Sequence, residues 1–304
     1  MKSWKLYLAG GGWSTIFGLS FLVTKGALEA FSPVTLLFLR FALASIAMLA
    51  LARLGFITVR FRGKPRLTLV LICIFQPVLY FTFETFGLRE VASSTAGLVL
   101  GALPAAVAAL SVPMLGERLS KRQVTGLVLS IAGVVAIVLV GESGADAANG
   151  AAGVAHDTLR GVLLVIGALV SAAFYNVFSR QARIHYKPSE TTFAMMLSGA
   201  VFFGLLAIIE GTPRGWSAVF GRATLAAWGS VAYLGLLSSV LAFFLVNLSL
   251  ARLKASQASV FGTLTTLVSL AAGVAFRGES FGFREAIGAA CIVTGVWMTN
   301  ARTR

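Results

Sequence analysis

The sequence predicts an all-α membrane protein with ten transmembrane helices, arranged as two inverted repeats of five helices each. Three observations carry this prediction: a very apolar composition, ten separate apolar runs, and a motif that recurs in the second half of the chain. Of the 304 residues, 58% are hydrophobic and only 12% are charged, whereas an ordinary soluble domain has about 25% charged residues. Much of the protein surface is therefore expected to face lipid.

The apolar runs have the lengths of membrane-spanning helices. A spanning helix needs roughly 20 apolar residues, because the hydrocarbon core of a bilayer is about 30 Å thick. The first run is too long for the apolar segment of a usual signal peptide, so we interpret it as a retained helix. The expected spans cover residues 6–28, 34–52, 67–88, 92–115, 123–141, 161–179, 191–209, 224–247, 255–276 and 286–300.

Lys and Arg residues are divided unevenly between the loops, and this division predicts the orientation. They concentrate in the termini and in alternate loops, most densely between Arg53 and Arg66. Basic loops mark the cytoplasmic side of a membrane protein. We therefore expect a multi-pass protein of the bacterial inner membrane with both termini in the cytoplasm. The same topology accounts for the net charge of +14, so no nucleic acid is expected as a partner.

A short motif recurs at a constant shift of 162 residues. Gly116-Glu117 ends the fourth apolar run, and Gly278-Glu279 ends the ninth. Further identities at this shift are Arg122 with Arg284, Gly126 with Gly288, and Gly133 with Gly295. Each repeat contains five runs, and an odd number inserts the second copy upside down, which is a transporter architecture. We expect a first repeat at 1–141, an outer linker at 142–158 and a second repeat at 159–304.

The Gly-Glu pairs suit the corner between two helices. Gly tolerates the left-handed conformation at a helix C-terminus. The Glu would lie near the start of the next helix, where a carboxylate meets unpaired N–H groups. We interpret Gly116, Glu117, Gly278 and Glu279 as structural corners of the repeat, with a gating role for either Glu as the alternative.

With these motifs, the chain resembles the EamA-type transporters of the drug/metabolite transporter superfamily. The resemblance covers nearly the whole chain. It implies the export or exchange of small metabolites, often amino acids or amphiphilic compounds, through a central cavity. One departure is Thr266, which stands where a second mid-helix proline is expected and leaves open whether that helix is kinked. The motifs are Trp13-Ser14 followed by Lys25, Leu39-Arg40-Phe41, Pro104 before Leu115-Gly116-Glu117-Arg118, and the repeated pattern from Ala255 to Gly295.

Three charged residues fall within expected spans: Lys25, Arg40 and Glu84. Charged side chains are costly in lipid and are functional candidates for that reason. All three are expected at a similar depth near the outer side, so they could pair with one another or take part in ion coupling. The alternative is that they extend toward the outer interface without pairing.

Polar and aromatic side chains recur on single helix faces. Gln76, Tyr80 and Glu84 are spaced by four residues, so they stack along one face. This face would line a water-filled cavity or pack against polar partners. Trp13 and Phe17 share a face of the first helix, which either packs against apolar groups or forms an aromatic wall for a substrate. The expected substrate-binding residues are Trp13, Phe17, Gln76, Tyr80, Glu84, Tyr175 and Asn176.

The leading hypothesis for function is a secondary transporter that moves a small molecule across a lipid bilayer by alternating access. The chain has no Walker A sequence for nucleotide binding. A passive channel is one alternative, and an intramembrane enzyme is another. The enzyme is disfavoured because His156 and His185 both fall outside the expected spans. Neither these histidines nor Cys73 and Cys291 have metal-ligand spacing, so we expect no metal and no cofactor.

Overall fold

A computed structural model describes residues 3–116, 119–141, 158–214, 220–221, 223–252, 255–279 and 282–300, and all regular elements within these ranges are helical. The predicted all-α class is thus confirmed for the described residues. The elements are α1 (Ser3–Ala27), α2 (Pro33–Arg53), α3 (Arg66–Cys73), η1 (Ile74–Tyr80), α4 (Phe81–Leu88), α5 (Ser93–Leu100), α6 (Leu103–Leu115), α7 (Lys121–Gly141), α8 (Leu159–Ala182), α9 (Pro188–Arg214), α11 (Leu225–Ala232), η3 (Tyr233–Ala242), α12 (Phe243–Arg252), α13 (Ala255–Arg277) and α14 (Phe283–Asn300).

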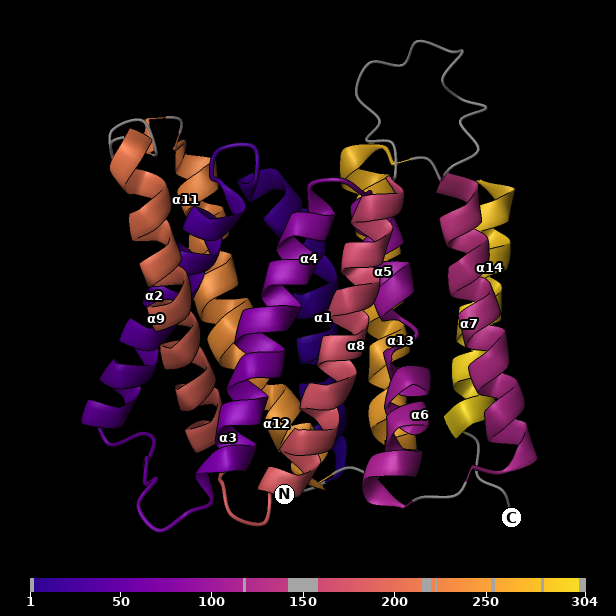
Figure 1. Cartoon of the computed structure of the whole chain (residues 1–304), viewed down its shortest axis with the longest axis horizontal. Helices are drawn as coiled ribbons and strands as arrows, with labels where there is room; N and C mark the ends of the chain where they lie inside the picture. The colour runs from indigo at the N-terminus through magenta and orange to yellow at the C-terminus, as the bar shows by residue number, and fades with distance from the viewer. Residues whose placement is uncertain are drawn as a thin grey trace.

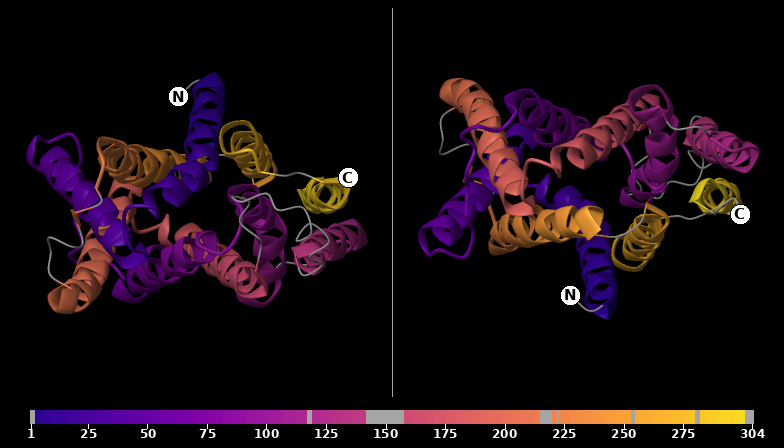
Figure 2. Two further views of the ribbon diagram at one scale, coloured as in Figure 1. Left: turned by 90° about the horizontal axis from the view of Figure 1, so that it is seen from above. Right: turned by 90° about the horizontal axis from the view of Figure 1, so that it is seen from below.

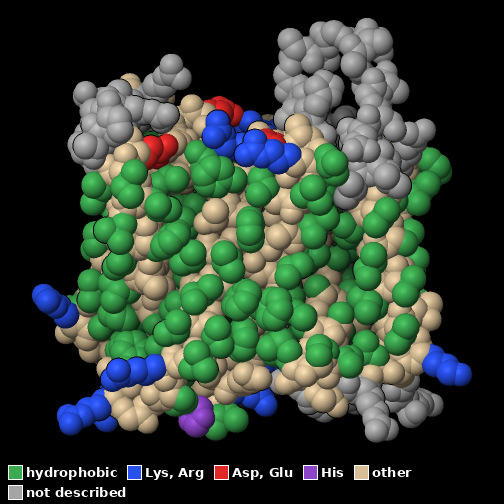
Figure 3. Space-filling view, viewed as in Figure 1, with side chains coloured by type: hydrophobic (Ala, Val, Ile, Leu, Met, Phe, Trp, Pro, Cys, Tyr) green, Lys and Arg blue, Asp and Glu red, His purple; other side chains and the backbone are tan. Residues whose placement is uncertain are grey.

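Six helical segments of the described chain have the length and hydropathy of a membrane span, and two shorter apolar helices accompany them. On the face drawn in Figure 3, hydrophobic side chains form a broad belt, with Lys and Arg side chains at its two edges. This distribution is that of a multi-pass membrane protein, because the belt matches a hydrocarbon layer and the charges reach water. The six segments are Pro33–Arg53, Arg66–Leu88, Ser93–Met114, Leu159–Ala182, Pro188–Gly211 and Leu225–Ser249.

Two of the expected spans contain π-helical turns. η1 interrupts the span from Arg66 to Leu88, and η3 interrupts the span from Leu225 to Ser249. Pro77 lies inside η1, where it has no N–H to donate to the preceding turn. The regular α-helical ladder therefore cannot continue through this position. π-helical turns occur frequently at functional sites, and each of these has a buried polar face, with Gln76 in η1 and with Ser238 and Ser239 in η3.

The fourth and ninth expected spans differ in their continuity. The helix around Pro104 is divided into α5 and α6 by a turn at Gly101-Ala102. In α13, where Thr266 replaces the expected proline, the helix runs without interruption. Thr266 retains its N–H and its hydroxyl donates to the carbonyl of Gly262 within the same helix. With threonine at this position the regular hydrogen-bond ladder can continue, and the helix is unbroken from Ala255 to Arg277.

The helices stand side by side along one long axis (Figures 1 and 2). α7 and α14 form a pair at one end of this axis, and α2 and α9 lie toward the other. α7 and α14 approach closely through glycines. A side chain at Gly126 would meet the backbone oxygen of Gly295 at 2.5 Å, and one at Gly133 would meet that of Gly288 at 2.7 Å. Only glycine allows this separation.

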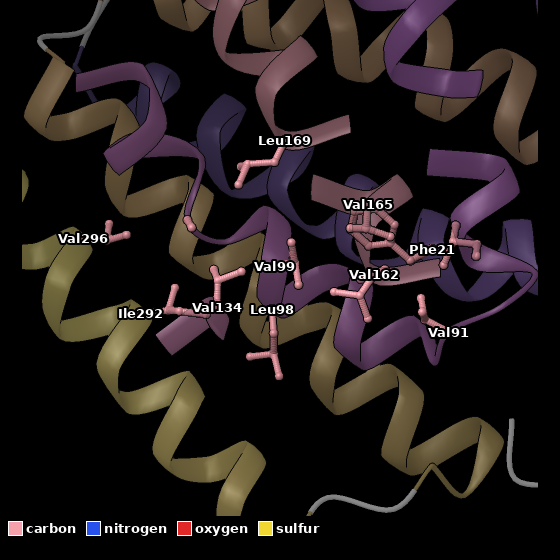
Figure 4. Packing of buried hydrophobic residues seen from close by; sticks show 13 residues of the cluster. Phe21, Val91, Leu98, Val99, Val134, Val162, Val165, Leu169, Ile292 and Val296 are labelled. Carbon is pink, nitrogen blue, oxygen red and sulfur yellow. The ribbon is translucent and has the colours of Figure 1, made fainter. Parts of the chain in front are cut away.

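The largest buried apolar contacts lie beside these helix pairs. One cluster joins α5 and α8 to α7 and α14, with Leu98, Val99 and Val165 at its centre (Figure 4). A second cluster joins α2 and α9 around Phe41 and Phe203, whose rings stack with centroids 5.7 Å apart. Without a hydrophobic driving force between helices in lipid, such close packing is what holds the bundle together.

The Gly-Glu corners agree in part with the expectation. Gly116 and Gly278 have left-handed φ angles of 67° and 61°, as a helix C-terminus of this type requires. Glu117 lies outside the described residues. Glu279 accepts from the backbone N–H of Ser93 at 2.8 Å and of Ser94 at 2.9 Å, at the start of α5. The fold thus brings the exposed N–H groups of α5 to the α13–α14 loop, and a contact of Glu279 with the start of α14 stays a prediction.

Candidate functional site: a central cavity

A cavity of about 240 Å³ lies in the middle of the bundle. It is bounded by α1, α2, η1, α4, α5, α6, α8, α12 and α13. All seven residues predicted to bind substrate line it: Trp13, Phe17, Gln76, Tyr80, Glu84, Tyr175 and Asn176. Their common location fits the expected cavity-facing stripes, whereas their role in binding stays a prediction.

Arg40 is the most buried cation of the described chain and forms part of the cavity wall. Its Nε donates to the hydroxyl of Ser239 at 2.8 Å, and one terminal nitrogen donates to the hydroxyl of Ser238 at 2.9 Å. Its guanidinium lies 4.2 Å from the ring centroid of Phe81. Two neutral hydroxyls and an aromatic face hold the group in place, but they do not neutralise its charge.

Glu84 is the buried acid of the same cavity and is 1% exposed. The hydroxyl of Thr85 donates to it at 3.2 Å, and Arg40 attracts it electrostatically without a direct ion pair among the described residues. Lys25, the third member of the expected charge cluster, does not line the cavity. Its ammonium group contacts the backbone oxygen of Val91 near the end of α4. The structure thus brings two of the three charges to one site.

An aromatic wall covers one side of the cavity. Phe17 and Phe243 pack edge to face at 5.1 Å, and Trp13 packs against Phe17 at 5.9 Å. Phe81 and Tyr175 both pack against Phe243, at 6.0 Å and 6.4 Å. Such a wall favours a solute with an apolar or aromatic body.

Polar groups within the wall differ in how well they are paired. Asn247 accepts from Tyr175 at 3.1 Å and donates to Thr192 at 3.0 Å, so it links α12 with α8 and α9. In contrast, Trp13 Nε1 and Gln76 Oε1 are buried and have no hydrogen-bond partner in the described part of the chain. A buried donor or acceptor without a partner costs about 1–3 kcal/mol. A ligand that pairs with these two atoms would recover part of that cost.

Several lining residues were not singled out from the sequence. Phe243 is one, although it lies 162 residues after Phe81 and the repeat shift would have found it. Ser238, which accepts from Arg40 but does not itself line the cavity, lies at the same shift from Gln76. Arg180 and Arg183 lie at the C-terminal end of α8. In the sequence they count only as basic residues of the loop after an expected span. Nothing in the local sequence distinguishes these two arginines from other basic residues of that end.

The cavity is open toward one end of the molecule and closed toward the other. It reaches the end at which α8 finishes, where Arg183 is exposed. At the opposite end Leu88 and Val91 are fully buried, and Glu279 joins the α13–α14 loop to α5 above them. Both α1 and α14 have their terminal ends on the open side (Figure 1). The site is therefore accessible from the side on which the described chain begins and ends.

The model of the EamA-like transporter family matches residues 4–139 and again residues 159–301. This chain belongs to the EamA-like transporter family. The two matched ranges together include every residue that lines the cavity. Membership also favours transport over the intramembrane enzyme that the sequence left as an alternative.

Relatives of this EamA-like transporter align with it over nearly the whole length of both chains. The uncharacterized transporter YcxC of Bacillus subtilis is 32% identical, with 97% of this chain and 92% of the relative covered. A probable terminal-alkyne amino-acid exporter of Streptantibioticus cattleyicolor is 26% identical, with 99% and 93% covered. A solved crystal structure matches with a TM-score of 0.66 at 22% identity and covers 97% of this chain and 95% of its own, which supports the fold alone.

Proposed function

We propose that this EamA-like protein is a secondary transporter that exports or exchanges a small metabolite by alternating access. The substrate is an amino acid or an amphiphilic compound of similar size. One observation carries the proposal: a closed-ended cavity with a buried cation, a buried acid and an aromatic wall lies in the middle of a membrane-spanning bundle. Relatives named as amino-acid exporters and efflux pumps agree with this substrate class.

The proposed architecture is ten spans in two inverted repeats, and contacts between equivalent residues support it. In a two-fold arrangement a residue near the axis meets its own equivalent. Phe41 stacks on Phe203, and Phe81 packs on Phe243; each pair is separated by 162 residues. The wall contains seven pairs at this shift, namely Trp13 with Tyr175, Phe21 with Arg183, Phe81 with Phe243, Glu84 with Val246, Leu100 with Gly262, Leu103 with Thr265, and Pro104 with Thr266.

Such an arrangement provides a mechanism for alternating access. If two halves have equivalent folds, exchanging their conformations closes the open end and opens the closed one. The cavity stays between the halves during this exchange, so the substrate meets each side in turn. Glu279 holds the α13–α14 loop to α5, so this loop would separate from α5 when the closed end opens.

Counterflow in proteoliposomes tests the proposal against a passive channel. Vesicles loaded with an unlabelled amino acid should take up the labelled form faster than unloaded vesicles, and uptake should saturate. A channel gives neither saturation at modest concentration nor stimulation from the opposite side. Uptake that equals the rate in protein-free vesicles for a broad panel of amino acids and amphiphilic compounds would contradict transport itself.

Glu84 is the proposed coupling residue, because it is the buried acid beside Arg40 in the cavity. An imposed pH gradient should drive accumulation of the substrate by the native protein. Glu84→Gln should abolish accumulation and preserve exchange, since exchange needs no net proton movement. Accumulation by a stably folded Glu84→Gln protein would show that coupling occurs elsewhere.

A further inference from the structure

Arg180 and Arg183 occupy the mouth of the central cavity. Both line the cavity itself and a smaller adjoining pocket of about 60 Å³ that extends toward Tyr186 and Thr191. Arg180 lies in the last turn of α8, and Arg183 is the C-cap residue three positions later with helical backbone angles, so the two share one face of the helix end. A solute that enters from the open end passes both guanidinium groups before it reaches Arg40.

These two charges are not neutralised by an acid in the described part of the chain. At the open end of the molecule the described acid is Glu190, and Lys64 pairs with it at 2.5 Å. The backbone N–H groups of Arg60 and Lys187 also donate to Glu190, so its carboxylate is already occupied. On the face shown in Figure 3 the acids gather at the opposite edge of the molecule. The mouth is therefore electropositive.

The charge of the whole cavity follows from its described lining residues. The charged ones are Arg40, Glu84, Arg180 and Arg183. Arg40 and Glu84 offset each other, which leaves the mouth with an excess of two positive charges. A narrow mouth with low-dielectric walls concentrates ions of the opposite sign and repels those of the same sign. Excess basic residues on the cytoplasmic side explain why arginines occur at this end, but not why these two lie on the cavity wall.

We propose that Arg180 and Arg183 form a selectivity site that admits solutes carrying a carboxylate and rejects solutes with a net positive charge. The aromatic wall then holds an apolar body, so the substrate class is a small carboxylate, zwitterionic or anionic, with an apolar or aromatic side group. A guanidinium group suits this role because its fixed donors match the two oxygens of a carboxylate. This inference rests on the proposed function and narrows its substrate class.

Three probes of matched shape test the inference on the purified full-length protein. At about pH 6, below the range in which an α-amino group titrates, L-phenylalanine is zwitterionic, 3-phenylpropanoate is anionic, and L-phenylalaninamide is cationic, while all three carry the same ring. Affinities come from thermal stabilisation, because a ligand that binds the folded state raises the melting temperature by mass action. The two carboxylates should bind more tightly than the amide, and added salt should weaken this preference by screening.

Three variants assign the preference to the mouth. The double variant Arg180→Gln/Arg183→Gln should reduce the preference roughly fivefold for each charge removed, because unit charges about 4 Å apart in water attract by about 1 kcal/mol. Arg180→Lys/Arg183→Lys keeps both charges and should retain most of it. The matched control is Arg62→Gln, which removes an exposed charge from the same end but does not line the cavity. It should bind all three probes like the native protein.

Several results would overturn the inference. Equal or tighter binding of the amide by the native protein is one, and an equal loss in Arg62→Gln and in the double variant is another. Failure of all three probes to bind counts against it too, since the wall and mouth should hold at least one carboxylate. Transport measurements distinguish the two proposals. Selective binding without transport would contradict only the proposal of a transporter. Transport without a charge preference would contradict only the proposal of a selectivity site at the mouth.

Discussion

Arg40 illustrates how a charged residue is accommodated inside a membrane protein. Its hydrogen bonds go to Ser238 and Ser239 from η3, and its planar group lies over Phe81 from α4. None of these partners carries a charge, so Glu84 supplies the nearby opposite charge in the described cavity. Lys25, in contrast, contacts a backbone oxygen outside the cavity. The two cations therefore have different roles, although both are expected at similar depth from the sequence.

Removing Glu84 should destabilise the protein through Arg40. Glu84→Gln leaves a desolvated cation without its counter-charge, which typically costs about 3–5 kcal/mol. Adding Arg40→Met should recover part of the loss, with a coupling of about 1–3 kcal/mol between the two sites. Thermal unfolding in detergent of the four proteins of this cycle measures the coupling.

Lys25→Met is the control for that cycle. Combined with Glu84→Gln, it should add its own effect without coupling, because its ammonium group contacts the backbone oxygen of Val91 and the residue does not line the cavity that contains Glu84. The assignment would be wrong if Lys25 coupled to Glu84 more strongly than Arg40 does.

At the scale of helices, glycines decide which pairs approach most closely. α7 and α14 meet at Gly126, Gly133, Gly288 and Gly295, with backbone against backbone. Gly229 in α11 differs from these glycines, because a side chain there would meet nothing within 4 Å. The sequence shows where the glycines are, but only the helix pairing distinguishes the ones that are required.

Gly126→Val should separate α7 from α14 and lower the melting temperature. Its new Cβ would lie 2.5 Å from a backbone oxygen and 2.7 Å from the backbone nitrogen of Thr299, neither of which can move aside alone. Overpacking of this kind costs about 1–3 kcal/mol. Gly229→Ala is the matched control and should cause no loss, because nothing lies within 4 Å. Equal melting temperatures for both variants would refute the close contact.

The contact of Glu279 with α5 should make stability depend on pH. Burial acts to raise the pKa of Glu279, but hydrogen bonds from Ser93 and Ser94 outweigh it and hold the pKa below the usual value. A carboxyl with a lowered folded-state pKa stabilises the fold above its unfolded pKa, and this stabilisation is lost as pH falls through the folded-state value. The native protein should therefore be more stable than Glu279→Gln near neutral pH.

Thermal unfolding at a series of pH values measures this dependence. The difference between the native protein and Glu279→Gln should shrink as pH falls below about 4, in the range where an ordinary carboxyl titrates. A difference that stays constant, or one that grows as the solution becomes more acidic, would contradict the contact.

At the scale of the whole molecule, the bundle has one open and one closed end, and the termini of α1 and α14 lie on the open side. With the cytoplasmic orientation that the basic loops predict, the cavity faces the cytoplasm. This is the state in which an exporter takes up its substrate. The orientation stays a prediction, because the helical bundle by itself does not show which of its two ends faces the cytoplasm.

Single cysteines test the orientation in intact cells, in a background without Cys73 and Cys291. Arg62→Cys lies in the loop at the open end, and Arg89→Cys follows α4 at the closed end; both positions are exposed. A membrane-impermeant maleimide should label Arg89→Cys and spare Arg62→Cys until the membrane is permeabilised. The reverse pattern would place the termini outside the cell.

The sequence by itself determined the class of fold and the family, because both depend on patterns along the chain: apolar runs, basic loops and a motif repeated at a fixed shift. It also found the polar and aromatic stripes of the cavity, since four-residue spacing places residues on one helix face. Only the tertiary structure decided which stripes face one another, that Arg40 is held by Ser238 and Ser239, and that Glu279 accepts from the first N–H groups of α5. Each of these contacts joins residues more than 180 positions apart, and nothing local in the chain encodes the meeting of such distant segments.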